Sequence, residues 1–153
     1  MRSFAILALS STLVLGACAT GSSTDKAAIK ASAGNADFIY RGLGERIGID
    51  RLVDTFMTLL LADQRVGTSL NDADIPHLKQ KLSEQFCKLG GGPCAYTGKS
   101  MAEIHDGLNI TSTQFYALVE DLQIAMERNG IGTPVQNQLL AKLAPMFRDV
   151  VTK

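Results

Sequence analysis

Apolar residues recur three and four positions apart through most of the chain after residue 38, and no strand-like alternation interrupts them. Stripes with this spacing lie in residues 75–89, 115–126 and 135–150. The clearest one, in residues 49–60, comprises Ile49, Leu52, Val53, Phe56, Met57 and Leu60. Because each stripe covers one face of an amphipathic helix, the pattern predicts an all-α domain.

Capping and helix-breaking residues delimit the later helices. Thr111 followed three residues later by Gln114 predicts a capping box at a helix start. Asn129-Gly130 is a typical stop for that helix. Thr133-Pro134 opens the last helix, and Pro145 is expected to kink it.

The amino terminus has the pattern of a targeting segment. Met1-Arg2 supplies a positive start, and Phe4 to Leu15 is an apolar run too short to span a bilayer comfortably. Leu15-Gly16-Ala17-Cys18 then resembles a bacterial lipobox. That motif implies cleavage before Cys18 and lipidation of its thiol, so residues 1–17 are expected to be a lipoprotein signal peptide. A plain secretory signal is the alternative.

The segment after Cys18 is expected to be a spacer. Small and polar residues dominate positions 18–35, which is typical of a flexible tether. Residues 36–153 are then expected to be the folded domain. A lipidated chain of this kind would lie in the bacterial cell envelope and face the periplasm, and Ala19 after the cysteine favours the outer membrane.

The charge balance excludes one class of partner. The chain has 15 basic and 15 acidic side chains, and no basic face stands out in its sequence. We therefore expect no nucleic-acid partner.

The stretch most informative about function is Phe86 to Ile110. An apolar helical stripe ends at Gly90-Gly91-Gly92-Pro93, and a short helical segment from Ser100 to Gly107 carries His105. Neutral imidazole is the commonest side chain for binding a transition metal through a ring nitrogen. His105 is therefore a candidate metal ligand, although an isolated histidine on a helix is more often an ordinary surface or core residue.

Four motifs of this stretch resemble those of the bacterial group I truncated haemoglobins. They are Leu-Gly-Gly-Gly-Pro, Ala-Tyr-Thr-Gly-Lys, Met-Ala-Glu-Ile-His and Gly-Leu-Asn-Ile-Thr. The resemblance runs from about Ala36 to the C-terminus. It implies a truncated globin fold, which is a two-over-two helical sandwich enclosing haem b, with His105 as the proximal ligand of the iron. It also implies that Phe56, Phe86 and Tyr96 contribute to the haem pocket.

The distal side of the expected pocket departs from the family. Group I members typically have a tyrosine on the second helix and a polar pair on the distal helix, whose hydrogen bonds stabilise dioxygen. The matching positions here are apolar: Met57, Leu78 and Leu82. Ser69-Leu70 replaces the aromatic pair that normally leans on the haem. These changes predict fast dissociation of dioxygen, and they leave a haem-free helical lipoprotein open as an alternative.

Lys81 is the one polar residue expected to reach the distal side. Its ammonium is expected to extend to a haem propionate or to solvent. Alternatively, the apolar surroundings favour the neutral amine, and Lys81 then ligates the iron opposite His105.

Cys87 and Cys94 also leave two alternatives open. Cys87 ends a predicted helix and Cys94 lies in the loop just after it, so the two thiols are close enough to pair. An oxidising compartment would favour the disulfide, whereas an unpaired Cys87 would pack as a small hydrophobe. The chain has no Cys-x-x-Cys-His sequence, so covalent c-type attachment of haem is not indicated.

The function that these features predict is binding of dioxygen, nitric oxide or carbon monoxide at a membrane-anchored haem. One alternative is an enzyme, a nitric oxide dioxygenase, which would need an unknown reductase as partner; the apolar distal side argues against it. A second is a six-coordinate electron-transfer protein with Lys81 as distal ligand. The third is the haem-free lipoprotein.

Overall fold

The computed structural model describes residues 36–153, and the expected signal peptide and tether lie outside the described residues. All regular elements of the described part are helical, and none of its helices is both long and apolar enough to cross a membrane. The elements are α2 (Phe38–Gly42), α3 (Glu45–Ala62), the 3-10 turn η1 (Gly67–Leu70), α4 (Ile75–Leu89), α5 (Met101–His105), α6 (Ser112–Arg128), α7 (Thr133–Leu143), the 3-10 turn η2 (Ala144–Met146) and α8 (Phe147–Val150).

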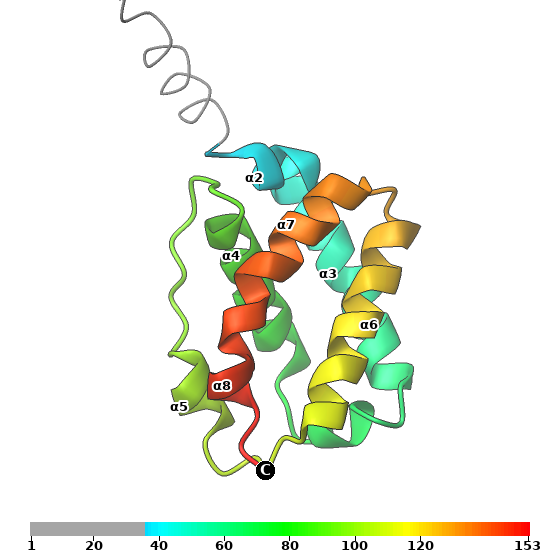
Figure 1. Ribbon diagram of the computed structural model, residues 1–153, viewed down its shortest axis with the longest axis vertical. Coiled ribbons are helices and arrows are strands. Elements are labelled where there is room, and N and C mark those ends of the chain that lie inside the picture. Colours follow the sequence, from blue (N-terminus) through cyan, green and yellow to red (C-terminus); the bar gives the residue numbers. More distant parts are fainter. Residues whose placement is uncertain (1–35) are drawn as a thin grey trace, which may run out of the picture.

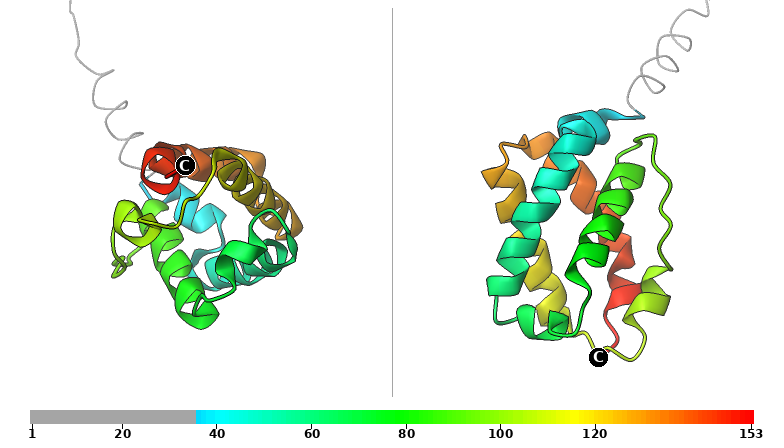
Figure 2. Two further views of the ribbon diagram at one scale, coloured as in Figure 1. Left: turned by 90° about the horizontal axis from the view of Figure 1, so that it is seen from below. Right: turned by 180° about the vertical axis from the view of Figure 1, so that it is seen from behind.

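The longer helices form two layers (Figures 1 and 2). One layer contains α3 and α4, and the other contains α6 together with the rod made by α7 and α8. Helix α3 makes its most extensive contacts with α4 in its own layer and with α6 in the other. The expected two-over-two helical sandwich is therefore confirmed.

The predicted stripe of α3 forms the centre of the core. All six apolar residues of that stripe are at most 3% exposed. They pack against buried residues of α6 and α7, such as Leu122, Met126 and Leu139. Burial of a fully covered aliphatic or aromatic side chain stabilises a fold by about 1.5–3 kcal/mol, so this stripe alone accounts for a large share of the driving force for folding.

The predicted helix boundaries are confirmed at the later helices. Thr111 Oγ1 accepts a hydrogen bond from the Gln114 backbone N–H at 3.2 Å, and Gln114 Oε1 accepts one from the Thr111 N–H at 3.0 Å. Pro145 lies in η2, where the last helix changes from α7 to α8. Proline cannot donate to the carbonyl four residues earlier, which explains the break.

The corner between α2 and α3 contains a strained residue. Gly44 has a φ of 84°, and Glu45 follows with a φ of 58°. A side chain with a Cβ rarely adopts this left-handed conformation, so Glu45 costs stability that a glycine would not.

The glycine-rich loop after α4 lies tightly against α2. Tyr40 N–H donates to the Gly90 carbonyl at 2.9 Å. Gly91 has a φ of 80°, and a Cβ there would collide with the carbonyl of Ala36. Glycine is therefore required for the loop to turn at this place and pass so close to α2.

A disulfide joins Cys87 to Cys94, with the two Cα atoms 5.9 Å apart. Of the two alternatives left open by the sequence, the structure therefore has the paired form. Cys87 is completely buried at the end of α4, and Cys94 lies in the loop that leads to α5. The bond thus fastens the start of this loop to the end of α4.

We predict that replacing both cysteines by alanine lowers the free energy of unfolding by roughly 2.5 kcal/mol, the value expected for a closed loop of about eight residues. Urea unfolding of the oxidised protein with and without a phosphine reductant checks this. The double variant is the control, because it should not respond to the reductant. Two free thiols in the untreated protein, or equal stability before and after reduction, would contradict the prediction.

Candidate functional site

A cavity of about 190 Å³ lies between the two layers, with α4 on one side and α5 on the other. Most of its lining is apolar, with α6 supplying Phe115, Leu118 and Leu122. Seven of the eight residues predicted for the pocket line it: Phe56, Leu78, Lys81, Leu82, Phe86, Tyr96 and His105. The structure therefore brings together residues that are up to 49 positions apart in the sequence.

Met57 is the eighth predicted residue, and it does not line the cavity. Its side chain is 2% exposed and packs in the core formed by α3 and its neighbours. Phe56, one position earlier, faces the cavity instead. The orientation of α3 thus directs Phe56 toward the cavity, and Met57, about 100° further around the helix, into the core.

His105 ends the short helix α5. Its Nδ1 lies 2.8 Å from the backbone carbonyl oxygen of Met101, one turn earlier. A carbonyl can only accept, so this contact selects the tautomer that carries the proton on Nδ1. The lone pair of Nε2 then remains available to a metal ion.

Two features hold α5 in place. At its start, Ser100 and Glu103 form a capping box, in which the Ser100 N–H donates to the Glu103 carboxylate at 2.8 Å. Beyond its end, the Ile110 carbonyl accepts hydrogen bonds from the backbone N–H groups of Thr152 and Lys153, at 3.0 and 3.2 Å. The C-terminus therefore fastens the segment that follows His105.

The distal wall, formed by α4, is apolar at the positions that the sequence singled out. Leu78 and Leu82 both line the cavity and are partly buried. Neither side chain can donate a hydrogen bond. Leu70, from η1, also lines the cavity, whereas Ser69 Oγ accepts from Gln114 Nε2 at 2.9 Å.

Lys81 has a partner that the sequence did not indicate. Its Nζ lies 3.1 and 3.3 Å from the two carboxylate oxygens of Glu84, and it also contacts Thr97 Oγ1. The same carboxylate accepts from the Thr97 N–H at 3.0 Å and from Thr97 Oγ1 at 2.8 Å. These hydrogen bonds from Thr97, followed by those from Lys81 and Gln80, lower the pKa of Glu84 to about 2.

Tyr96 lies beside this ion pair. Its hydroxyl donates to the Lys99 carbonyl at 2.9 Å, so its polar end is directed along the loop. Burial, followed by the negative charge of Glu84, raises the pKa of the Tyr96 phenol. Tyr96 therefore lines the cavity as a neutral aromatic residue.

Gln85 was not predicted, yet it lines the cavity. Its amide Nε2 lies 3.4 Å from Met101 Sδ and 3.6 Å from Met146 Sδ, so it links the distal helix to α5 and η2. Thioether sulfur is a weak acceptor. The sequence could have indicated Gln85 as a lining residue, because it follows Leu82 by three positions and so lies on the same face of α4.

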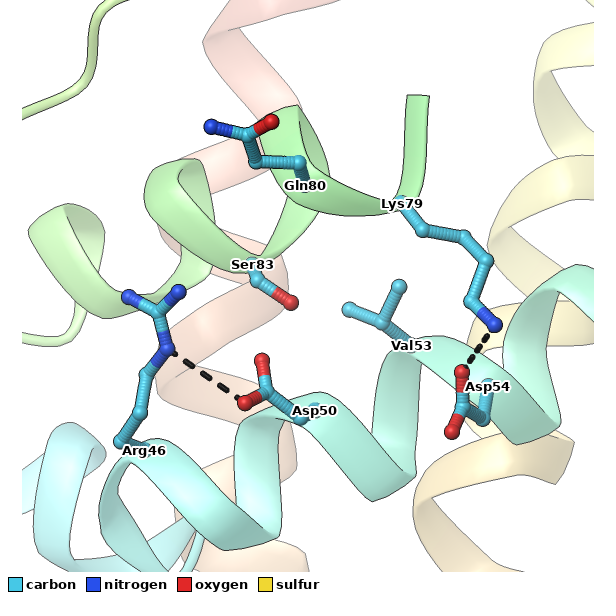
Figure 3. A pocket seen from close by; sticks show the side chains of 7 residues that line it. All are labelled: Arg46, Asp50, Val53, Asp54, Lys79, Gln80 and Ser83. Carbon is cyan, nitrogen blue, oxygen red and sulfur yellow. Dashed lines mark hydrogen bonds and ion pairs between the residues drawn. The ribbon is translucent and has the colours of Figure 1, made fainter. Parts of the chain in front are cut away.

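A second hollow, of about 210 Å³, lies on the outer side of α3 and α4 (Figure 3). Arg46 Nε lies 3.4 Å from Asp50 Oδ2, and Lys79 is paired with Asp54. Each cation is thus already balanced by a carboxylate of α3, and both pairs are substantially exposed. Because these charges already balance one another, they give no reason to expect a charged ligand in this hollow.

Comparison with known proteins identifies the family. A family model described as bacterial-like globin matches residues 38–152. A group 1 truncated haemoglobin of Tetrahymena pyriformis is 30% identical over 115 residues, which is 75% of this chain and 95% of that protein. The chain belongs to the bacterial-like globins, among the group 1 truncated haemoglobins. A group 1 truncated haemoglobin of Mycolicibacterium paratuberculosis is 28% identical, over 74% of this chain and 84% of its own.

Solved structures agree with this assignment. The ferric truncated haemoglobin of Tetrahymena pyriformis has a TM-score of 0.72 and 30% identity, covering 75% of this chain and 98% of that one. A 2/2 haemoglobin of Synechococcus, at 22% identity, has a TM-score of 0.70 over 75% of this chain and 98% of that one, and shows the likeness of fold. The expected truncated globin fold is therefore confirmed.

Truncated haemoglobins bind haem, and the lining of this cavity has the chemistry that suits that group. It combines apolar walls, an imidazole oriented through Nδ1, and one ammonium, that of Lys81, among its lining residues. Apolar walls suit the porphyrin ring, and an imidazole with a free Nε2 suits its iron. The ammonium of Lys81 is already paired with Glu84.

Proposed function

We propose that this truncated haemoglobin holds haem b through His105 and binds diatomic gases on the opposite side, at a site anchored to a membrane. The observation that supports this most directly is the hydrogen bond from His105 Nδ1 to the Met101 carbonyl, at the wall of an apolar cavity. Haem iron supplies the binding chemistry for dioxygen, nitric oxide and carbon monoxide when it is present. The protein orients the haem, excludes water from the pocket and determines the polarity around the bound gas.

The apolar distal wall supports gas binding without strong retention of dioxygen. Dioxygen depends on hydrogen-bond donors more than carbon monoxide does, and Leu78 and Leu82 supply none. Of the polar lining residues, Lys81 is held by Glu84 and Gln85 lies against two sulfurs. Transient binding or sensing therefore fits this pocket better than storage does.

The ion pair between Lys81 and Glu84 also weighs against the electron-transfer alternative. A lysine must lose its proton before its nitrogen can ligate iron. In the structure the Lys81 ammonium is stabilised by the carboxylate of Glu84, whose side chain is 11% exposed. The arrangement therefore favours a five-coordinate iron with an open distal position.

The first experiment tests the ligand role of His105. Haemin is titrated into the apoprotein, and the Soret band is followed for the wild type, His105→Ala and His77→Ala. We expect the wild type and His77→Ala to bind alike, because His77 is exposed and does not line the cavity. Loss of a metal-orienting group costs about 10–100-fold in affinity, so His105→Ala should weaken binding at least tenfold. Unchanged affinity and spectrum in His105→Ala would refute the assignment, and a wild type that stays colourless with haemin would refute the proposed function.

A second experiment tests the apolar distal side. Leu82→Gln places an amide donor on the distal wall, and a hydrogen bond to a charged acceptor contributes about 1.5–3 kcal/mol. Dioxygen dissociation, measured by stopped flow, should therefore slow by at least about tenfold in this variant. Carbon monoxide dissociation is the internal control and should change much less. Equal effects on the two gases would contradict the role given to hydrogen bonding.

The membrane anchor is supported by the sequence Leu15-Gly16-Ala17-Cys18 alone. We expect full-length protein expressed in a Gram-negative host to carry lipid on Cys18 and to partition with the outer membrane. Cys18→Ser should move the protein to the soluble fraction, and mass spectrometry of the new N-terminus should show the loss of the acyl groups. A wild-type chain that is soluble and cleaved at another position would favour the secretory signal instead.

A further inference from the structure

Two methionine sulfurs lie at the wall of the cavity, next to the same amide. The structure describes four methionines, and two of them, Met57 and Met126, are at most 2% exposed in the core. Met101 and Met146 are only partly buried, and both line the cavity. Their Sδ atoms lie 3.4 and 3.6 Å from Gln85 Nε2, so the two sulfurs are no more than about 7 Å apart. We call these three side chains, Gln85, Met101 and Met146, the thioether cluster.

The amide of Gln85 is poorly satisfied in this cluster. Its Nε2 carries two N–H groups, and thioether sulfur is only a weak acceptor. Among the residues that the structure describes, these two sulfurs are the only hydrogen-bond partners of this nitrogen. A partly buried donor without a good acceptor costs free energy. A stronger acceptor at the position of either sulfur would therefore be favourable.

Oxidation of a methionine supplies such an acceptor. A lone pair of the sulfur attacks one oxygen of hydrogen peroxide, so that a sulfur–oxygen bond forms while the oxygen–oxygen bond breaks. The hydroxide that leaves takes the proton of the transferred oxygen and departs as water. The sulfur is thereby oxidised by two electrons and the peroxide is reduced. The product is a methionine sulfoxide, a polar side chain in place of an apolar one.

We propose that Met101 and Met146 form a modification site at which hydrogen peroxide produces methionine sulfoxide, and that the Gln85 amide donates a hydrogen bond to the new oxygen. Negative charge develops on the transferred oxygen while the sulfur–oxygen bond forms. An N–H group already beside the sulfur stabilises that charge, because hydrogen bonds to charged acceptors are stronger than those to neutral ones. Gln85 is therefore expected to accelerate the oxidation as well as to stabilise its product.

The position of Met101 connects this modification to the proximal side of the pocket. Met101 is the first residue of α5, and its carbonyl accepts the hydrogen bond from His105 Nδ1. Met146 lies in η2, and α8, which follows it directly, contacts α5 (Figure 1). A sulfoxide would thus place a polar oxygen on the apolar wall beside the helix that carries His105. We expect an apolar ring to bind less tightly there, a consequence that rests on the proposed function, whereas the oxidation itself does not.

The test oxidises the full folded chain without haem, so that iron contributes no reaction of its own. The chain is treated with dilute hydrogen peroxide, catalase stops the reaction, and mass spectrometry of peptides gives the oxidation rate of each methionine. Because oxidation follows exposure, Met101 and Met146 should react at least about tenfold faster than Met57 and Met126. In Gln85→Leu the two fast rates should fall about fivefold, the factor that corresponds to one ordinary hydrogen bond.

Gln80→Leu is the matched control for the glutamine. Gln80 is an exposed residue of the same helix, α4, and it does not line the cavity. All four oxidation rates in this variant should equal those of the wild type. The two core methionines report on folding in every variant, because they become reactive only when the core opens.

A second measurement tests the consequence for the pocket. Haemin is titrated into the chain before and after oxidation, once the peroxide has been removed. The affinity of the wild type should fall at least about fivefold on oxidation, the lower end of the cost of placing a polar group in an apolar site. The double variant Met101→Leu/Met146→Leu should keep its affinity through the same treatment, because it has no sulfur at the cavity wall.

Three results would overturn the inference. One is a common oxidation rate for all four methionines of the wild type. Another is an unchanged or faster oxidation of Met101 and Met146 in folded Gln85→Leu. The third is a haemin affinity that oxidation leaves unchanged, or that it lowers equally in the double variant.

Failure of the proposed function has a different signature. The wild type would then bind no haemin even before oxidation, and the oxidation rates of the four methionines would still decide whether the thioether cluster is a modification site. If Gln85→Leu does not fold, its core methionines become reactive too. The comparison of the four rates within the wild type, and the response of the double variant, then decide.

Discussion

The hydrogen bond from His105 to the Met101 carbonyl is the interaction on which the proposed function depends, and several parts of the fold hold it in place. Helix α5 has only five residues, and so short a helix is not stable by itself in water. Its geometry must come from its surroundings. Three features restrict the movement of α5 and therefore of its imidazole. They are the capping box at Ser100, the loop before α5 that the disulfide fastens, and the hydrogen bonds of the C-terminal backbone after α5.

The electrostatics of the pocket are arranged around a single carboxylate. The wall that α4 contributes to the cavity is apolar, so an ammonium without a carboxylate partner would be poorly solvated there. Glu84 compensates that charge, and Thr97 and Gln80 in turn compensate Glu84. A buried carboxylate with this many donors is well satisfied, which is why it stays ionised.

The helices could be predicted from the sequence because their apolar stripes depend only on the spacing of neighbouring residues, as the buried face of α3 illustrates. It also placed His105 and six further residues at the cavity through the family resemblance. The contact between Glu84 and Thr97 could not be predicted, since it depends on the path of an irregular loop 13 positions away. Met57 was assigned to the pocket by alignment of motifs, and the rotation of α3 directs it to the core instead.

The attachment of the last two residues to the Ile110 carbonyl has a practical consequence for work on this protein. The Thr152 hydroxyl also accepts a hydrogen bond from the Ile110 N–H at 3.1 Å, so residues 152 and 153 form a small clasp around the segment that follows His105. An affinity tag fused directly after Lys153 would pull on that clasp. Fusions are better placed ahead of α2, or separated from Lys153 by a spacer long enough to leave the clasp closed.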